Sequence, residues 1–409
     1  MQRRRSRLGI STPLIGFIVL VSMLATAGFL TSQYLRPLPA LAVHSQLQAE
    51  REIGTPPILP WPSKGSAAIS VKGFGFLGAH GDETPRPIAS TAKIMTALLV
   101  LEDHPLAPGQ SGPEVTITSQ DVADYQRDIA QDQSVVLVAA GEKLTELQLL
   151  QALLLPSGNN IADVLAKWDA GSKEAFIAKM NARAAELGMA HTHYDDASGF
   201  SAKTVSTPSD LLIVGAKAME NPVFRQTVAM AQATIPVAGV VHNVNSILGK
   251  DGNIGIKTGS TDEAGGCFLS ASIQQVAGES MEIYAAVLGQ DRLSDALDAT
   301  TALTRAVAAS FRRTKLLSRT DIGATLTPAW GNQVEVVPSQ DVEMLVWPGT
   351  VLKTSLKLDT VQAPLPAGAK VGTITLQLGA RTQQVDAVTT APIVQPTWQW
   401  RVTRFLRRQ

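Results

Sequence analysis

Residues Pro85–Asp103 read PRPIASTAKIMTALLVLED and contain a serine and a lysine three residues apart, a spacing found in serine nucleophiles with a lysine base. Its apolar residues recur with helical spacing, which predicts a helix that begins near Ser90. Ser90 and Lys93 are three residues apart and would therefore share one face of that helix. A lysine whose pKa is lowered by burial can take the proton of a serine hydroxyl and make it a nucleophile. Most Ser-x-x-Lys tetrapeptides are instead a helix cap followed by a solvated lysine, so other motifs have to decide.

Length and composition predict an ordered globular protein of two or three units. The 409 residues are 45% hydrophobic and 17% charged, and the formal net charge is zero. Four of the 35 basic residues lie near each terminus: Arg3, Arg4, Arg5 and Arg7, then Arg401, Arg404, Arg407 and Arg408. Without these eight, 27 basic residues face 35 acidic ones, and an acidic body argues against nucleic-acid binding. Basic ends on such a body favour contact with a membrane at the termini.

The sequence gives no sign of a disulfide, a metal site or a cofactor. Cys267 is the single cysteine, which excludes an intrachain disulfide and a cysteine-based metal site. His191 and His193 form the one close histidine pair, and spacing places no third ligand beside them. We therefore expect chemistry carried by side chains alone.

The N-terminal segment, residues 1–35, is predicted to be a signal-anchor or transmembrane helix. Residues 13–30 carry no charge and follow the arginine cluster, so the chain beyond about residue 35 is expected outside the cytoplasm. Small residues at 25–27 and at 40–42 would also fit cleavage of a signal peptide. Both fates remain open, and the length of the apolar run favours a retained anchor.

Four further segments follow in the predicted organisation. Residues 36–64 are rich in proline and suggest an extended tether, and residues 65–313 alternate helix and strand patterns. Residues 314–391 show short alternating runs broken by Pro and Gly, which predict a small all-β domain with a structural role. Residues 392–409 place Trp and Phe among arginines, which suits an interfacial amphipathic helix or a disordered basic tail.

Two other short motifs have the residue types that acyl transfer needs. Ser157-Gly158-Asn159 follows Pro156, which ends a helix, and so lies on a turn that presents a hydroxyl and an amide. Lys257-Thr258-Gly259 lies on a predicted strand, where a positive charge and a hydroxyl suit a substrate carboxylate. Each motif alone is common by chance.

In this order, the three motifs resemble the signature S-x-x-K, S-D-N, K-T-G of penicillin-binding proteins and class A β-lactamases, with Gly158 in place of aspartate. Longer stretches, among them GEKLTELQLLQALLLPSGNNIADVLA and GIKTGSTDEAGGCFL, resemble the serine-type D-alanyl-D-alanine carboxypeptidases, the low-molecular-mass penicillin-binding proteins. The resemblance spans about Ser66 to Phe311. It implies a mixed α/β (α+β) transpeptidase-like domain, with an antiparallel sheet flanked by helices, and the β domain that follows is similar to one that many members carry.

The resemblance also implies roles for single residues. Ser90 would be the nucleophile and Lys93 its general base, acting on the penultimate D-alanine of a peptidoglycan stem peptide. Ser157 would relay protons to the leaving D-alanine, and Asn159 would hold the substrate amide. Lys257 and Thr258 would bind the terminal carboxylate, while Gly259 lets the substrate backbone approach. The backbone N–H groups of Ser90 and Ser260 would form the oxyanion hole. No cofactor or metal is implied, and β-lactam antibiotics would acylate Ser90.

Three alternatives stay in view. A DD-endopeptidase that cuts cross-links would use the same residues. A serine β-lactamase needs a deacylating carboxylate, and no E-x-x-L-N-like loop is found between Asn160 and Gly255. A wall-binding protein that has lost activity would be expected to lack the serine or a lysine.

Overall fold

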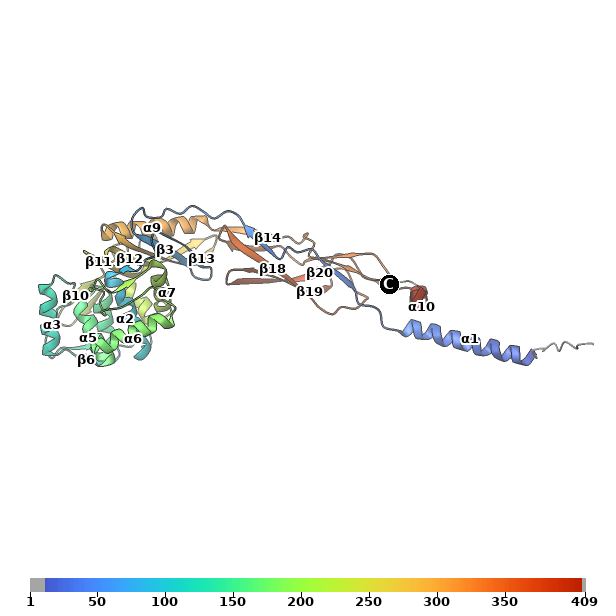
Figure 1. The fold of residues 1–409 in the computed structure, drawn as a ribbon, viewed down its shortest axis with the longest axis horizontal. Helices are drawn as coiled ribbons and strands as arrows, with labels where there is room; N and C mark the ends of the chain where they lie inside the picture. Colours follow the sequence, from blue (N-terminus) through green and yellow to red (C-terminus); the bar gives the residue numbers. More distant parts are fainter. Residues whose placement is uncertain (1–11, 407–409) are drawn as a thin grey trace, which may run out of the picture.

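The computed structural model describes residues 12–406 and shows an elongated molecule (Figure 1). A helical and sheet-containing domain lies at one end, a β domain lies in the middle, and helix α1 (Thr12–Leu35) extends from the other end. The arginines at positions 3, 4, 5, 7, 407 and 408 lie outside the described residues. The structure therefore does not test the predictions of orientation and membrane contact that depend on these arginines.

The first domain is built on a five-stranded antiparallel sheet in the order β11-β12-β13-β3-β4. Its strands are β11 (Asn253–Thr261), β12 (Gly265–Val276), β13 (Glu279–Gln290), β3 (Ser66–Val71) and β4 (Gly75–His80). The strand–turn–strand element predicted for residues 66–78 is the β3–β4 hairpin. β11 forms one edge of the sheet and β4 the other, so the Lys-Thr-Gly motif lies on an edge strand.

Both faces of this sheet are covered by helices, and the side chains of β13 show how. Ile283, Ala285 and Val287 point to the core shared with α9 (Leu293–Ser310), while alternate residues point to a helical lobe. The lobe contains α2 (Lys93–Asp103), α3 (Ser119–Ala130), α4 (Glu146–Leu154), α5 (Asn159–Ala170), α6 (Lys173–Glu186), α7 (Pro208–Ala218) and α8 (Pro222–Val228). The fold predicted from the resemblance is therefore confirmed.

Short elements complete the domain. Strand pairs link β5 (Arg86–Pro87) with β8 (Val205–Ser206), β6 (Glu114–Thr116) with β7 (Lys143–Thr145), and β9 (Gln232–Ile235) with β10 (Gly239–His242). Two 3₁₀ turns, η1 (Ala89–Ala92) and η2 (Lys250–Gly252), precede α2 and β11. The helix predicted from Ser90 thus begins as a 3₁₀ turn and becomes α-helical at Lys93.

The β domain contains a seven-stranded sheet in the order β1-β15-β16-β20-β19-β18-β2 and a separate pair, β14-β17. Its strands are β1 (Ala42–Ser45), β2 (Glu50–Ile53), β14 (Arg312–Leu317), β15 (Ala324–Thr327), β16 (Val334–Pro338), β17 (Val342–Val346), β18 (Thr350–Leu358), β19 (Lys370–Leu378) and β20 (Arg381–Thr389). Strands β1 and β2 fall inside the stretch expected to be a tether. Their sequences, AVHS and EREI, are too short and too polar to be recognised as strands without their partners. Those partners lie about 300 residues away in the chain.

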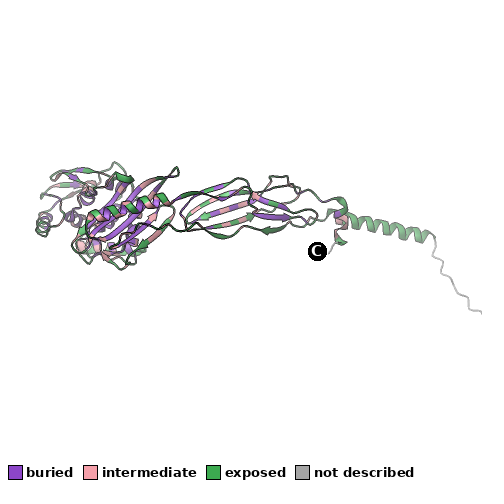
Figure 2. Ribbon diagram, turned by 90° about the horizontal axis from the view of Figure 1, so that it is seen from above, coloured by how far each residue is buried: buried purple, intermediate pink, exposed green. Residues whose placement is uncertain are grey.

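The seven-stranded sheet must roll. Its two edge strands, β1 and β2, are joined by the short segment between Ser45 and Glu50, which reaches at most about 19 Å. A flat sheet of this size would hold its edges roughly 29 Å apart. The rolled sheet encloses a core of its own, which includes Leu326, Ile374 and Leu376, and Figure 2 shows buried residues inside this domain.

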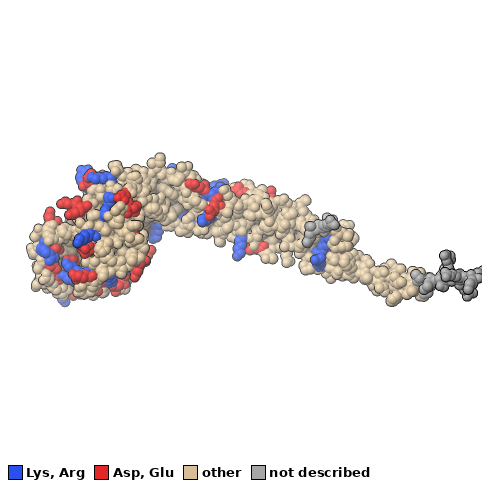
Figure 3. Space-filling view, viewed as in Figure 1, with Lys and Arg blue, Asp and Glu red and all other residues tan. Residues whose placement is uncertain are grey.

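Helix α1 has no buried residue, and all of its residues except the half-buried Gln33 are exposed (Figure 2). It is long and apolar enough to cross a membrane, with a mean hydropathy of 2.3 over its most apolar window, and it contains no charged residue. Figure 3 shows the same uncharged span extending beyond the charged body. Near its end lie α10 (Trp398–Thr403) and η3 (Arg404–Leu406), which form a short helix in the segment predicted to be an amphipathic tail.

Candidate active site

Ser90 and Lys93 meet at the junction between η1 and α2. Lys93 Nζ lies 2.8 Å from Ser90 Oγ, as the three-residue spacing predicts. The Lys93 side chain is fully buried, whereas Ser90 is half-buried and open to a substrate. Ala89, just before Ser90, has a φ of 46°, so the backbone turns sharply to present the serine.

Three oxygens surround Lys93 Nζ. Besides Ser90 Oγ, these are Asn159 Oδ1 at 2.6 Å and the main-chain oxygen of Ser198 at 2.9 Å. A neutral amine has two N–H groups and one lone pair. Asn159 and Ser198 can accept the two N–H groups, which leaves the lone pair for the Ser90 hydroxyl proton. The arrangement is therefore suited to a general base.

The electrostatics favour that neutral amine. Burial lowers the pKa of Lys93 well below that of a free lysine, and the positive charge of Lys257 lowers it further. The carboxylates of Asp196 and Asp163 act in the opposite direction. Burial also lowers the pKa of Lys257, to about 7.

The Ser157-Gly158-Asn159 turn is held between α4 and α5. Ser157 is buried and has a φ of 70°, and Asn159 N donates to Ser134 O over 2.8 Å. A Cβ on Gly158 would lie 2.9 Å from a methyl group of Val136, which explains why the middle position is glycine. The turn thus places Asn159 directly on Lys93.

The Lys-Thr-Gly strand β11 lies against η1. A Cβ on Gly259 would lie 2.8 Å from Ser90 N, so glycine alone allows this approach. Lys257 and Thr258 are buried, and Lys257 Nζ donates to the main-chain oxygen of Thr258 over 3.0 Å. Ser260, next along β11, is exposed. The structure therefore brings all three motifs to one place.

Three site residues could not be recognised from the sequence. Gln133 Oε1 accepts a hydrogen bond of 2.6 Å from Asn159 Nδ2 and so fixes which way the amide points. Ser198 contributes its carbonyl to Lys93, and Asp196 accepts hydrogen bonds within the same loop. All three lie in polar loops whose sequence carries no signal of their distance from Lys93. His191 and His193, the one pair considered for a metal, show no metal-binding group of three side chains in the described residues.

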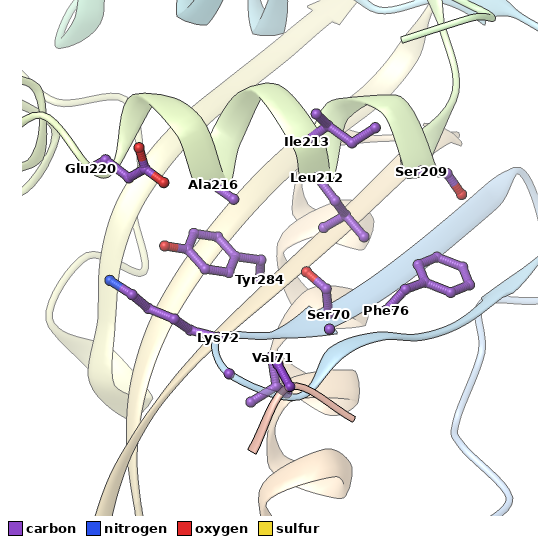
Figure 4. A pocket seen from close by; sticks show the side chains of 13 residues that line it. Ser70, Val71, Lys72, Phe76, Ser209, Leu212, Ile213, Ala216, Glu220 and Tyr284 are labelled. Atoms are coloured by element: carbon purple, nitrogen blue, oxygen red, sulfur yellow. The ribbon is translucent and has the colours of Figure 1, made fainter. Parts of the chain in front are cut away.

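An apolar cavity of about 530 Å³ lies away from this site, beside β3, β4 and α7 (Figure 4). Leu212 of α7 points toward Tyr284 and Phe76, and Ile213 also lines the cavity. None of the eight candidate residues lines this cavity, and it is at the opposite edge of the sheet from β11. The site at Ser90 is therefore defined by its hydrogen bonds and motifs.

Comparison with known proteins gives the family. The model of the family "Peptidase_S11: D-alanyl-D-alanine carboxypeptidase" matches residues 75–292. The D-alanyl-D-alanine carboxypeptidase of Streptomyces sp. strain K15 is 37% identical over 207 residues, which are 46% of this chain and 69% of the relative. A D-alanyl-D-alanine endopeptidase of Pseudomonas aeruginosa is 31% identical over 216 residues, 51% of this chain and 66% of the relative.

A solved structure shows the same fold over both domains. The D-alanyl-D-alanine carboxypeptidase DacD from Francisella tularensis matches with a TM-score of 0.59, and the match covers 84% of this chain and 97% of that one at 19% identity. The family model, the identity to the Streptomyces protein and the shared fold lead to one conclusion. This chain belongs to the D-alanyl-D-alanine carboxypeptidase family of serine-type hydrolases.

Proposed function

We propose that Ser90 attacks the carbonyl of the penultimate D-alanine in a peptidoglycan stem peptide and forms an acyl-enzyme. The hydrogen-bond geometry at Lys93 carries this proposal, because two of its three oxygen neighbours can accept its N–H groups and leave its lone pair for Ser90 Oγ. Loss of the terminal D-alanine follows, and water then cleaves the ester to restore Ser90. β-Lactams, which present a strained amide to the same serine, acylate it and block the site.

Substrate binding is assigned to the two motifs that flank the serine. Asn159 Oδ1 is taken by Lys93, and one Nδ2–H is taken by Gln133. The second Nδ2–H is free to donate to a substrate carbonyl. Ser157, two residues before Asn159, passes a proton to the departing amine.

The terminal carboxylate is received by Lys257 and Thr258 on β11. The close approach of Gly259 to Ser90 N supports an oxyanion hole made by the N–H groups of Ser90 and Ser260. Charge on Lys257 supplies attraction for the carboxylate, while its burial removes competing water.

Endopeptidase action on cross-linked peptidoglycan is the second candidate. It is favoured by the similarity to the Pseudomonas aeruginosa protein named an endopeptidase. The residues around Ser90 serve either reaction, because both break a bond that follows a D-alanine.

For the location, we propose that α1 anchors the protein in the cell membrane with the catalytic domain on the outer side, facing peptidoglycan. The support is the length and apolarity of α1, none of whose residues is buried. The arginines that precede α1 in the sequence, at positions 3, 4, 5 and 7, agree with this orientation.

The test is D-alanine release from a pentapeptide ending in D-Ala-D-Ala, using the full chain in detergent and the variant Ser90→Ala. Release by the native chain and none by the variant would support the carboxypeptidase. Release from a cross-linked dimer alone would favour the endopeptidase. Folded native protein that neither releases D-alanine nor is labelled by penicillin would contradict both.

A further inference from the structure

The last described residues of the chain contact the end of helix α1. Arg401 donates a hydrogen bond from Nη1 to Tyr34 O over 3.2 Å. Arg404 donates to three main-chain oxygens, those of Gln33 at 2.9 Å, Arg36 at 2.8 Å and Pro37 at 3.0 Å. Two side chains therefore bind four carbonyl groups at and just beyond the end of α1.

These carbonyls need partners. The last turn of a helix leaves C=O groups without intrahelical donors, and the last turn of α1 contains no basic residue that could serve them. A guanidinium presents several N–H groups in a fixed plane, and its positive charge is favourable at a helix C-terminus. Arg401 and Arg404 thus supply from the far end of the sequence what α1 lacks.

Apolar and aromatic contacts accompany the hydrogen bonds. The rings of Phe29 and Phe405 meet edge to face, with centroids 5.1 Å apart. The guanidinium of Arg401 lies 5.4 Å from the centroid of the Tyr34 ring. Ring contacts together with the four hydrogen bonds make this a packed junction rather than a chance crossing of two termini.

The C-terminal helix is fixed to the β domain as well. Trp400 is 9% exposed and packs against Trp330, with ring centroids 5.5 Å apart. Trp330 Nε1 in turn donates to Val394 O over 2.8 Å. Trp400 of α10 therefore packs on the β domain, while Arg401 of α10 and Arg404 of η3 bind the end of α1.

The junction lies where the membrane surface would be. A helix of 24 residues spans about 36 Å, slightly more than a hydrocarbon core of roughly 30 Å. The end of α1 that the two arginines contact would therefore lie at the bilayer surface.

From these contacts we propose that α10 and η3 form a clamp on the outer end of α1. Through this clamp the mature protein keeps α1, and the β domain is held on its anchor instead of swinging on a flexible tether. The inference rests on the membrane attachment proposed above but not on the reaction at Ser90. It differs from a freely inserting amphipathic tail because the guanidinium groups are used by the chain itself.

The first test is a crosslink in the full chain reconstituted in phosphatidylcholine–phosphatidylglycerol vesicles. A short thiol crosslinker should join Phe29→Cys to Phe405→Cys in most molecules, because the two rings they replace are in contact. The native Cys267 is buried and will not compete for the reagent. The matched control pairs Phe405→Cys with Leu20→Cys, which lies about 13 Å further along α1. Equal yields from both pairs, or none from the first, would overturn the clamp.

The second test separates the clamp from simple attraction to anionic lipid. Arg401→Ala combined with Arg404→Ala should raise the rate of proteolysis within residues 36–41 about tenfold, as expected when charge-assisted hydrogen bonds are lost. The double lysine variant keeps both charges but not the planar donors, and should behave like the alanine variant. Native behaviour of the lysine variant would instead show that the segment only responds to lipid charge.

The two controls are penicillin labelling and mass. Penicillin should label Ser90 equally in all variants. A variant that is labelled normally but has lost the clamp would show that the clamp and the proposed reaction are independent. The mass of the protein purified from membranes should include α1. A mature chain cut at residue 27 or 42 would contradict the proposal.

Discussion

Lys93 donates a hydrogen bond to the main-chain oxygen of Ser198, and the loop that presents this oxygen is held by Asp196. Asp196 Oδ2 accepts from Ser198 Oγ at 2.6 Å and from Phe200 N at 2.9 Å, while its other oxygen accepts from Thr204 Oγ1. Its negative charge also raises the pKa of Lys93, against the stronger effect of burial. Asp196 is thus a positioning residue that acts on the base without contacting the nucleophile.

Asp196→Asn should move the acidic limb of the pH profile for penicillin acylation to lower pH. Removal of the negative charge disfavours the ammonium form, so the pKa of Lys93 falls and the neutral base persists in more acidic solution. The measurement is the acylation rate constant as a function of pH. Asp195→Asn, whose carboxylate accepts from Ser201 Oγ instead, is the control and should leave the limb in place. A limb that moves to higher pH would contradict the assigned electrostatics.

Lys257→Arg should remove an alkaline loss of substrate affinity. Because burial lowers the pKa of Lys257 to about 7, the native enzyme is expected to lose its positive charge, and KM for the pentapeptide is expected to rise, as the pH passes that value. Arginine stays protonated throughout this range, so KM of the variant should be nearly flat between about pH 6 and 9, though higher overall. The same alkaline rise in both proteins would show that another group titrates.

Gly259→Ala should cost about 100-fold in acylation rate. The new methyl group would lie 2.8 Å from Ser90 N and 2.9 Å from Ala89 Cβ, which forces the nucleophile away from β11. Misplacement of a reacting group by about 1 Å has an effect of this size. Gly331→Ala, whose nearest neighbour would be 3.4 Å away in the β domain, is the matched control. Full activity of Gly259→Ala would contradict the assignment of the oxyanion hole to the N–H groups of Ser90 and Ser260.

Glu146→Gln should stabilise the protein at alkaline pH. Glu146 is fully buried, neither carboxylate oxygen has a partner in the described residues, and burial raises its pKa to about 7. The unfolded chain releases this proton near pH 4.5, so native stability falls as the pH rises from there to about 7 and is level above it. The variant should lack this fall and gain roughly 2 kcal/mol at pH 8, with little difference at pH 4. Thermal unfolding at both pH values measures it, and equal midpoints at pH 8 would contradict a buried neutral carboxyl.

The sequence predicted the elements whose causes are local. Pro156 ends a helix by its own chemistry, and the spacing of Ser90 and Lys93 sets their shared face. The order of the three motifs indicated that Ser90, Asn159 and Lys257 belong to one site. The structure places these three residues together. Gln133 and Asp196 were missed because only the tertiary fold brings them to that site.

The two missed strands, β1 and β2, show a second limit. Val43 pairs with Leu326 and Arg51 pairs with Leu352, so the reason for each strand lies far along the chain. Proline-rich flanks hid them further, since such composition is typical of linkers. The contact of Arg404 with the end of α1 was hidden for the same reason.

This pairing also constrains the order in which the protein can fold. Strands β1 and β2 precede the first domain in the chain, but their partners follow it, about 300 residues later. The domain between them, which contains Ser90, can fold while the two strands wait unpaired. Closure of the rolled sheet joins segments about 300 residues apart, and closure is slow for such distant contacts. The supporting domain can therefore be completed only after strands β15 and β18 have been made.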